Sequence, residues 1–409
     1  MTTDDEQGPE LPLRATSIAA VYLVEQPDEL AGAIANLKLG TGPLAIDAER
    51  ASGFKYSNRA YLIQLHRTGS DVFLIDPINL SEEQSWKDLQ AFANEQTWIL
   101  HAATQDLSCL ADVGLRPKQI VDTELGSRIL GLPRVGLGAV CEQFLGFRLA
   151  KEHSAADWSI RPLPNNWLNY AALDVDVLPA LAKVLEEKLT EAGKTEWASQ
   201  EFNALLSFEP KAAKPDKWRG MSGIFALKDA ERLAIARELW HARDQLGKKL
   251  DVSPSRLIPD SSIIAAASSK VRSKSELASL SAFSGRASRT YLDTWWEAYQ
   301  AGLNSNDLPP LKVPNVGIPN HRNWPNRFPE ADTRLQALKQ VMSEISELNQ
   351  IPAENALQPD LLRRVAWEPS DDIASQLASL GARPWQVKLV AEKIILALSQ
   401  IALGTPEAS

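Results

Sequence analysis

The hydrophobic pattern of this chain changes near residue 210, and the change limits the folds that the chain can adopt. Before it, short apolar runs of strand length alternate with stretches of helical periodicity. After it, the periodicity is helical only, apart from segments rich in proline. We therefore expect an α/β domain with a mixed sheet in the first half of the chain and all-α domains in the second.

Four segments of the first half have the composition of β-strands. Residues 44–49 are a short apolar run interrupted by two acids. Residues 61–66 and 71–76 have the composition of β-strands, and they are separated by a four-residue connection that contains Gly69. Such a connection predicts a hairpin, so the three segments would form a meander. Residues 97–100 predict a fourth strand. Helices are expected at residues 104–114, 122–130, 137–144 and 165–191.

The second half of the chain predicts two helical blocks. A linker is expected at residues 207–215, where prolines and lysines interrupt the pattern. We expect an α/β domain at residues 1–208, a helical domain at 215–302, a proline-rich connector at 303–329 and a second helical domain at 330–404. Each block has one long helix, an extended or proline-containing stretch and then short helices. This shared layout is what a duplication would produce.

The composition excludes several classes of protein. Of the 409 residues 44% are hydrophobic and 23% are charged, which is globular composition. The two cysteines, Cys109 and Cys141, exclude a disulfide scaffold and favour a reducing compartment. The acidic N-terminus lacks the apolar run of a signal peptide, and no apolar window is long enough for a membrane helix. We expect a cytoplasmic protein with no membrane partner; protein partners are unknown.

The formal net charge of −9 hides an asymmetry along the chain. Residues 211–300 hold 16 basic and 10 acidic residues, whereas residues 1–210 hold 17 basic and 30 acidic residues. The basic segment can attract a polyanion such as nucleic acid. A solvated face of an ordinary helical domain explains it equally well. The last block is near neutral, which favours packing against the first domain over contact with a polyanion.

Asp47, Glu49, Asp106, Tyr170 and Asp174 form a candidate site. Asp47 and Glu49 are two apart on an expected strand and share a face, and Tyr170 and Asp174 share a helix face. Each feature alone has an ordinary explanation: a solvated edge strand, an acid that complements a helix dipole, or a surface pair. If they converge, four carboxylates would repel one another without cations. Oxygen ligands of this kind suit Mg²⁺ or Mn²⁺, and two such ions can promote phosphodiester cleavage.

The stretches around these residues resemble the ribonuclease D family, four-acid 3′→5′ exonucleases that carry a tyrosine. The resemblance covers residues 15–200 and rests on the stretches 45–49, 62–65, 75–77, 100–107 and 157–175. The Asp-Trp-Ser-Ile-Arg-Pro-Leu stretch from Asp157 to Leu163 makes it more specific than the acids alone. The two helical blocks are similar, on weaker evidence, to the HRDC (helicase and RNase D C-terminal) domains of that family.

The resemblance implies a ribonuclease H-like fold and two-metal hydrolysis of RNA from its 3′ end, with release of nucleoside monophosphates. Substrates would be tRNA precursors and other structured RNAs with short 3′ tails. By position, Asp47 would bridge both metals, Glu49 and Asp174 would complete the site that holds the attacking water, and Asp106 would serve the second metal. Tyr170 would orient the water.

The chain departs from the family's pattern at Arg50, where the family has an apolar residue. Arg50 would change how the terminal base is held, or would contact a phosphate. Two alternatives to an exoribonuclease stay open: an exonuclease that acts on DNA ends, and a non-catalytic nucleic-acid-binding scaffold.

Further substrate contacts are weaker candidates, and each has an ordinary structural explanation beside it. They are His101, Gln64, Lys151 and Arg161. Trp158 is expected to pack in the core. The basic residues expected to contact the RNA backbone are Lys211, Lys214, Lys217, Arg219, Arg243, Lys248, Lys249 and Arg256.

Overall fold

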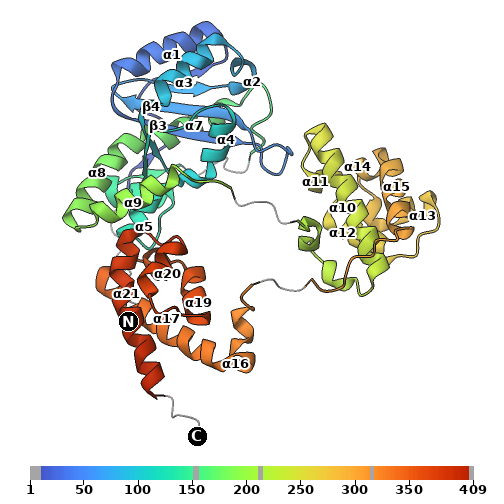
Figure 1. Ribbon diagram of the computed structural model, residues 1–409. Helices are drawn as coiled ribbons and strands as arrows, with labels where there is room; N and C mark the ends of the chain where they lie inside the picture. Colours follow the sequence, from blue (N-terminus) through green and yellow to red (C-terminus); the bar gives the residue numbers. More distant parts are fainter. Residues whose placement is uncertain (1–10, 151–155, 211–214, 314–316, 405–409) are drawn as a thin grey trace, which may run out of the picture.

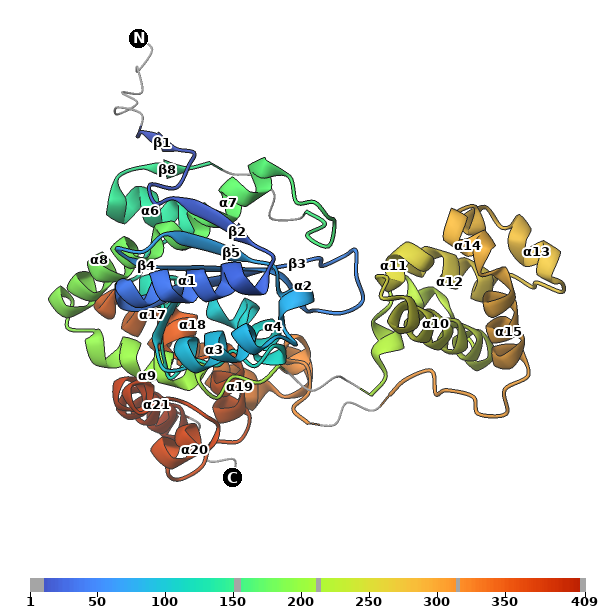
Figure 2. The same ribbon diagram turned by 90° about the horizontal axis from the view of Figure 1, so that it is seen from above.

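A computed structural model of the protein describes residues 11–150, 156–210, 215–313 and 317–404 (Figure 1). An α/β domain is followed by a middle helical domain to one side of it and by a last helical domain that lies against it (Figures 1 and 2). Each helical domain has its own buried core, formed by residues 218–299 and 324–394. The domain boundaries themselves stay a prediction. No helix within the described ranges has the length and apolarity to cross a membrane.

A six-stranded mixed sheet forms the centre of the α/β domain. Its strands are β2 (Val21–Val24), β3 (Thr41–Arg50), β4 (Ala60–Thr68), β5 (Val72–Ile75), β6 (Thr97–Leu100) and β7 (Gln119–Asp122), in the order β2-β5-β4-β3-β6-β7. β3, β4 and β5 pair antiparallel, and the other neighbours pair parallel. The short strands β1 (Leu13–Arg14) and β8 (Arg148–Leu149) pair separately. The expected meander, its hairpin and the fourth strand are confirmed.

Helices cover both faces of this sheet (Figure 2). One face packs against α1 (Pro27–Leu39), α3 (Gln84–Ala93) and α4 (Leu107–Asp112) in a core that contains Leu44, Ile46 and Ala48 of β3. The other face packs against α6 (Leu137–Leu145), α7 (Asn165–Asp176) and α8 (Leu178–Glu191). The remaining elements are α2 (Pro77–Leu80), η1 (Ala103–Gln105), α5 (Thr123–Ile129) and α9 (Thr195–Leu205). The strand β3 therefore directs alternate side chains toward α7.

The structure differs from the sequence prediction at short elements. Strands β2 and β7, of four residues each, are absent from the prediction. The single helix expected at residues 165–191 is two helices, α7 and α8. Pro179 lies in the first turn of α8, and a proline inside a continuous helix would remove a hydrogen bond and clash with the preceding turn.

The two helical domains repeat one layout. The middle domain contains η2 (Lys217–Gly220), η3 (Ile224–Ala226), α10 (Ala230–Leu250), α11 (Pro254–Leu257), α12 (Asp260–Ser268), α13 (Lys274–Ser279), η4 (Ser281–Phe283), α14 (Arg286–Thr290) and α15 (Leu292–Leu303). The last domain contains η5 (His321–Asn323), α16 (Trp324–Arg327), α17 (Pro329–Asn349), α18 (Ala353–Ala356), α19 (Pro359–Trp367), α20 (Ile373–Ser379) and α21 (Pro384–Gly404). In both, a 21-residue helix ends at a residue with positive φ, Asp251 or Gln350.

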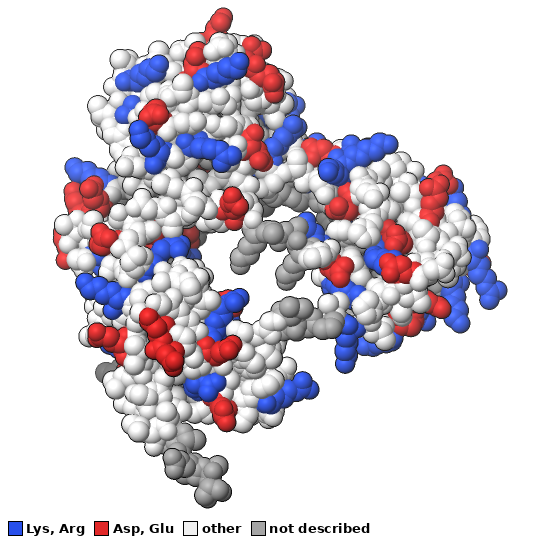
Figure 3. Space-filling view, viewed as in Figure 1, with Lys and Arg blue, Asp and Glu red and all other residues white. Residues whose placement is uncertain are grey.

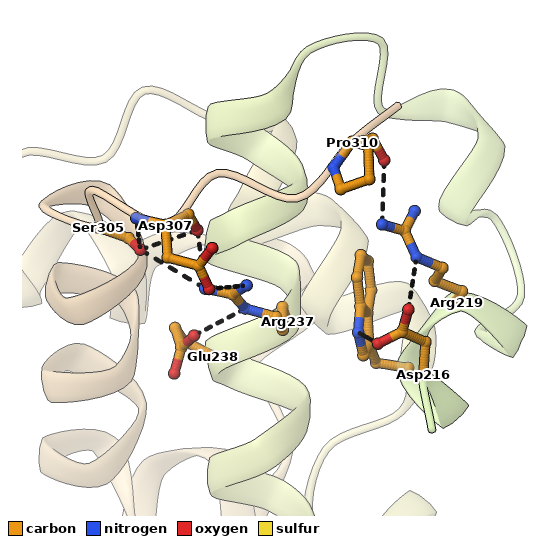
Figure 4. A network of polar contacts seen from close by, with 8 residues as sticks. Asp216, Arg219, Arg237, Glu238, Ser305, Asp307 and Pro310 are labelled. Carbon is orange, nitrogen blue, oxygen red and sulfur yellow. Dashed lines mark hydrogen bonds and ion pairs between the residues drawn. The ribbon is translucent and has the colours of Figure 1, made fainter. Parts of the chain in front are cut away.

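The segment after α15 lies along the middle domain instead of extending freely. Arg237 of α10 binds the carboxylate of Asp307 at 2.9 Å and its carbonyl at 3.0 Å (Figure 4). Arg219 donates to the carbonyl of Pro310 at 3.0 Å. Farther along, Trp324 is fully buried in the core of the last domain. The described residues on both sides of the expected connector are therefore held by polar contacts or by packing, and the bounds of the connector stay a prediction.

Both helical domains contact the α/β domain through the residue that ends their long helix. Asp251 accepts hydrogen bonds from the backbone N–H of Ser57 at 2.8 Å and from the hydroxyl of Tyr61 at 3.2 Å. The carbonyl of Gln350 accepts one from Lys194 at 2.9 Å. The last domain adds a larger apolar contact, in which Trp385 stacks on Trp197 with ring centroids 4.7 Å apart. The packing expected for the near-neutral block is confirmed.

We predict that Trp385→Ala lowers the free energy of unfolding by about 3–5 kcal/mol, because a large buried ring is removed. Trp385→Phe should cost about 1–2 kcal/mol, since it keeps most of the stacking and loses only the indole hydrogen bond to Glu201, which is 3.0 Å long. Urea unfolding of both variants checks this. Equal losses would show that the hydrogen bond, and not the stacked rings, holds the last domain.

Candidate active site

Three carboxylates meet where β3 faces α7. Asp47 and Glu49 alternate with the buried Ile46 and Ala48 along β3, so both point toward α7. Asp174 projects from α7 to meet them. One carboxylate oxygen from each of the three lies within 4.8 Å of the others. The expected convergence of strand and helix acids therefore occurs.

Asp106 joins this cluster from a turn. It stands between η1 and α4, where its backbone leaves the regular helix, and the residue is only 5% exposed. Its carboxyl group hydrogen-bonds that of Asp47. The predicted helix from residue 104 is thus a 3₁₀ turn followed by a short α-helix, and Asp106 is its N-cap residue.

Asp122 fixes the turn that carries Asp106, and sequence analysis does not single it out. Its buried carboxylate accepts hydrogen bonds from the N–H groups of Ala102 at 3.1 Å and Ala103 at 2.8 Å. It also caps α5 through the N–H groups of Glu124 and Leu125. The only signal in the sequence is an Asp-Thr pair before a helical stretch, which is typical of any N-cap. Its second set of partners comes from a turn that is distant in sequence.

A cavity of about 370 Å³ opens onto the cluster. Its walls include Asp47, Ala48, Glu49, Arg50, Ser52, His101, Ala102, Gln105, Asp106, Leu137, Ala156, Tyr170, Asp174 and Leu178. All four predicted acids and the predicted tyrosine therefore lie at one site. Its volume is at the lower end of the range for small-ligand pockets.

Burial and mutual repulsion raise the pKa of every acid in the cluster. Burial is the first cause for Asp47, Asp106 and Asp174. The pKa of Glu49 rises to about 10, through burial and then through the charges of Asp47, Asp174 and Asp106. Without added positive charge, the four groups cannot all be ionised near neutral pH.

The donor set of this site fits divalent cations. It consists of carboxylate oxygens, which are the ligands that Mg²⁺ and Mn²⁺ prefer. One oxygen from each of the three closest carboxylates lies within 4.8 Å of the others, and burial and the neighbouring charges raise the pKa of Glu49, so a bound cation would favour its ionised form. Asp47, Glu49 and Asp174 would hold a metal ion, with Asp106 beside them.

Tyr170 lies one helical turn before Asp174, and its hydroxyl group donates a hydrogen bond to that carboxylate. Burial and the nearby acids raise the pKa of the Tyr170 hydroxyl group well above its ordinary value. The phenol therefore stays protonated and acts as a hydrogen-bond donor.

Arg50 and His101 line the cavity beside the acids. The guanidinium group of Arg50 lies 3.7 Å from the carboxylate of Asp106, so it supplies part of the missing positive charge. The Nδ1 atom of His101 lies 2.8 Å from the hydroxyl oxygen of Thr123. Burial lowers the pKa of His101 to about 4, so its ring is neutral near pH 7. Its contact with substrate stays a prediction.

Two predicted substrate contacts do not line the cavity, and their role stays a prediction. Gln64 is completely buried on β4 opposite Asp47, and it does not line the cavity. Arg161 binds Asp76 at 2.5 Å, and it donates to the carbonyl oxygens of Tyr61 and Trp158 at 2.8 and 2.9 Å. Its guanidinium group is used to hold the loop before α7 onto the sheet. Trp158 is fully buried, as expected. Lys151, Lys211 and Lys214 lie outside the described residues.

We predict that Arg161→Ala lowers the free energy of unfolding by about 2–4 kcal/mol, because it leaves the buried carboxylate of Asp76 without its counter-charge. Arg134→Ala is the matched control. Arg134 pairs with Glu142 at 3.2 Å, but its side chain is 73% exposed, so its loss should cost under about 1 kcal/mol. Urea unfolding measures both. A similarly small loss for Arg161→Ala would restore it as a candidate surface contact.

We predict that the stability of the metal-free protein falls as pH rises from about 4.5 toward 10, the interval between the ordinary and the raised pKa of Glu49. In this interval the folded state binds more protons than the unfolded state, so raising the pH favours unfolding. Asp174→Asn removes one repelling charge, so its stability in EDTA should fall less steeply. Added Mn²⁺ should stabilise the native sequence strongly at high pH and the variant weakly.

Thermal unfolding in EDTA and in Mn²⁺, at several pH values, measures this. Asp371→Asn, an exposed acid of the last domain, is the control and should follow the native sequence. If the stability of Asp174→Asn changes with pH and with Mn²⁺ in the same way as that of the native sequence, Asp174 does not belong to the cluster of repelling acids.

Comparisons with known proteins agree with this architecture. Residues 21–190 match the family model of the 3′-5′ exonuclease, and residues 232–299 match that of the HRDC domain. Residues 317–398, which cover most of the block expected to be a second HRDC-like domain, match a separate model, the 3′ to 5′ exonuclease C-terminal domain.

Curated relatives include Ribonuclease D of Cronobacter turicensis, which is 28% identical over 318 residues, or 76% of this chain and 82% of that protein. Ribonuclease D of Escherichia coli is 27% identical over 320 residues, which cover 76% of this chain and 80% of that protein.

Solved structures resemble the whole chain. The crystal structure of a protein from Bifidobacterium adolescentis is 36% identical and covers 95% of this chain and 100% of its own, with a TM-score of 0.88. The crystal structure of Escherichia coli RNase D is 24% identical and covers 93% of this chain and 99% of its own, with a TM-score of 0.65, which shows the same fold. The expected fold class is confirmed. The exonuclease and HRDC matches follow one another in this order, and the chain is similar to proteins named Ribonuclease D over 76% of its length.

Proposed function

We propose that this protein is a metal-dependent exoribonuclease that hydrolyses RNA from its 3′ end and releases nucleoside 5′-monophosphates. The observation that carries the proposal is the meeting of Asp47, Glu49 and Asp174 within 4.8 Å, in a cavity that Asp106 and Tyr170 also line. Relatives named Ribonuclease D support the choice of RNA. DNA ends are the alternative substrate, and a scaffold without catalysis is the alternative function.

The acids of the cluster would hold two divalent ions, either Mg²⁺ or Mn²⁺. When bound, such ions supply an activated water and neutralise charge on the leaving oxygen in phosphodiester cleavage. Asp47 is the central ligand in this proposal, since it lies beside Glu49 on β3 and hydrogen-bonds Asp106. Glu49 and Asp174 complete the group that holds the attacking water, and Asp106 serves the other side of the site.

Tyr170 orients the attacking water and does not remove its proton. The raised pKa of its hydroxyl group keeps it protonated, so it can donate a hydrogen bond but cannot act as a general base. Its hydrogen bond to Asp174 fixes the ring near the acids. Arg50, which faces Asp106, would contact the phosphate of the terminal nucleotide once the acids are neutralised by metal ions.

The cavity volume of about 370 Å³ supports a substrate whose terminal nucleotide enters alone. A duplex end would have to unpair before it could reach the acids. Short single-stranded 3′ tails on structured RNAs, such as tRNA precursors, satisfy this requirement. The structurally similar RNase D of Escherichia coli is an exoribonuclease involved in structured RNA processing, which supports the same substrate class here.

We predict that Asp47→Ala lowers the rate of cleavage on the order of a thousandfold or more, equivalent to about 4 kcal/mol of lost transition-state stabilisation. Binding of RNA should persist, since other parts of the chain contribute to it. The assay uses a 5′-labelled RNA with a single-stranded 3′ tail and a DNA of the same sequence, each with Mg²⁺, Mn²⁺ or EDTA. The control Asp371→Asn should keep the native rate.

A metal-dependent ladder that shortens from the 3′ end of the RNA is the expected product. Equal ladders on RNA and DNA would favour a general exonuclease. The absence of product with every metal would favour a non-catalytic scaffold. Activity retained by Asp47→Ala would contradict the proposal that the acid cluster is the active site.

A further inference from the structure

A second hollow lies on the middle helical domain, between the end of α10, α11 and α14. We refer to it as the α11–α14 groove, and its volume is about 730 Å³. Its lining includes Arg256, Arg286 and Tyr291. Of the described residues, two arginines and no acid line it. The groove therefore has the charge that a chain of phosphates requires.

The groove begins where the rim of the catalytic cavity ends. Ser52, in the loop between β3 and β4, lines the cavity. The next two residues, Gly53 and Phe54, contact the groove residue Arg256, whose Nε donates to the carbonyl of Gly53 at 2.8 Å and whose guanidinium group lies 4.0 Å from the centre of the Phe54 ring. Ser253 donates from its backbone N–H to the carbonyl of Phe54 at 2.9 Å. One short loop tip separates the two hollows.

Arg286 is available to a ligand. Its side chain is exposed, and no acid in the described parts of the chain pairs with it. Arg243, which sequence analysis also proposes as a backbone contact, is 6% exposed and binds the carbonyl of Ile258 and the carboxylate of Asp260. The expectation for Arg243 is therefore wrong, because the interior of the domain uses its charge. Lys and Arg side chains are visible at the end of the middle domain beside the α/β domain (Figure 3).

We propose that the α11–α14 groove binds the backbone of single-stranded RNA upstream of the nucleotide in the catalytic cavity. This inference rests on the proposed exoribonuclease function. The α/β domain carries a large excess of acids, so it repels a polyanion except where its metal ions lie. A strand that leaves the cavity past Ser52 reaches Arg256 and then Arg286, where the groove offers charge for phosphates. Tyr291, which is half-buried, also lines the groove.

The test compares Arg286→Glu with Arg289→Glu on two substrates. Both arginines are exposed on α14, but Arg289 does not line the groove, so it is a matched control for charge and for helix stability. The substrates are a single-stranded RNA of about twenty nucleotides, longer than many single-strand binding sites, and a trinucleotide, which extends only two nucleotides beyond the catalytic cavity. We expect Arg286→Glu to raise the KM of the long RNA by roughly tenfold, as for loss of a charged contact, and to leave its kcat unchanged.

The trinucleotide should be cleaved by Arg286→Glu with native kinetics, and Arg289→Glu should resemble the native protein on both substrates. The salt dependence gives an independent measure: for a single strand, each phosphate that the variant no longer binds lowers the slope of log K against log [salt] by about 0.7. Thermal unfolding confirms that both variants fold. If Arg286→Glu leaves the KM of the long RNA unchanged, or raises the KM of the trinucleotide equally, the proposal that the groove binds RNA is wrong. If the native protein cleaves neither RNA with Mg²⁺ or Mn²⁺, the proposed function itself fails.

Discussion

The repulsion among four carboxyl groups that line one cavity is the constraint on which the rest of the structure depends. Asp47, Glu49, Asp106 and Asp174 each have a raised pKa, so the fold loses stability by holding them together. A site of this kind is kept only if cations or protons neutralise it. The same feature that destabilises the metal-free protein therefore creates its affinity for divalent ions and its chemistry.

The scaffold counters this repulsion with rigid elements and buried polar supports. Two acids come from the central strand β3 and one from α7, which packs across β3, β4 and β5. The fourth comes from a turn. Asp122 holds this turn in place by accepting hydrogen bonds from two of its backbone N–H groups. Arg161 holds the loop before α7 in the same way. These residues never enter the cavity, yet they determine where its acids lie.

The helical domains use one contact geometry for different purposes. In both, the residue that ends the first long helix, Asp251 or Gln350, meets the α/β domain. The middle domain then touches the loop after β3, beside the catalytic cavity, through polar contacts. The last domain buries Trp385 against Trp197 of α9, as an apolar interface would. The two domains share a layout but differ in role. The middle domain offers a candidate substrate surface, and the last domain supports the α/β domain.

The sequence by itself determined the class of fold, the three central strands and the five residues that line the cavity, because period, spacing and local motifs carry this information. The sequence does not show where a side chain lies when that depends on distant segments: Gln64 is buried outside the cavity, and Arg161 binds Asp76 and backbone carbonyl groups. Asp122 and the α11–α14 groove depend on segments that are far apart along the chain. Only the tertiary structure decided these, since burial and charge pairing arise when such segments meet.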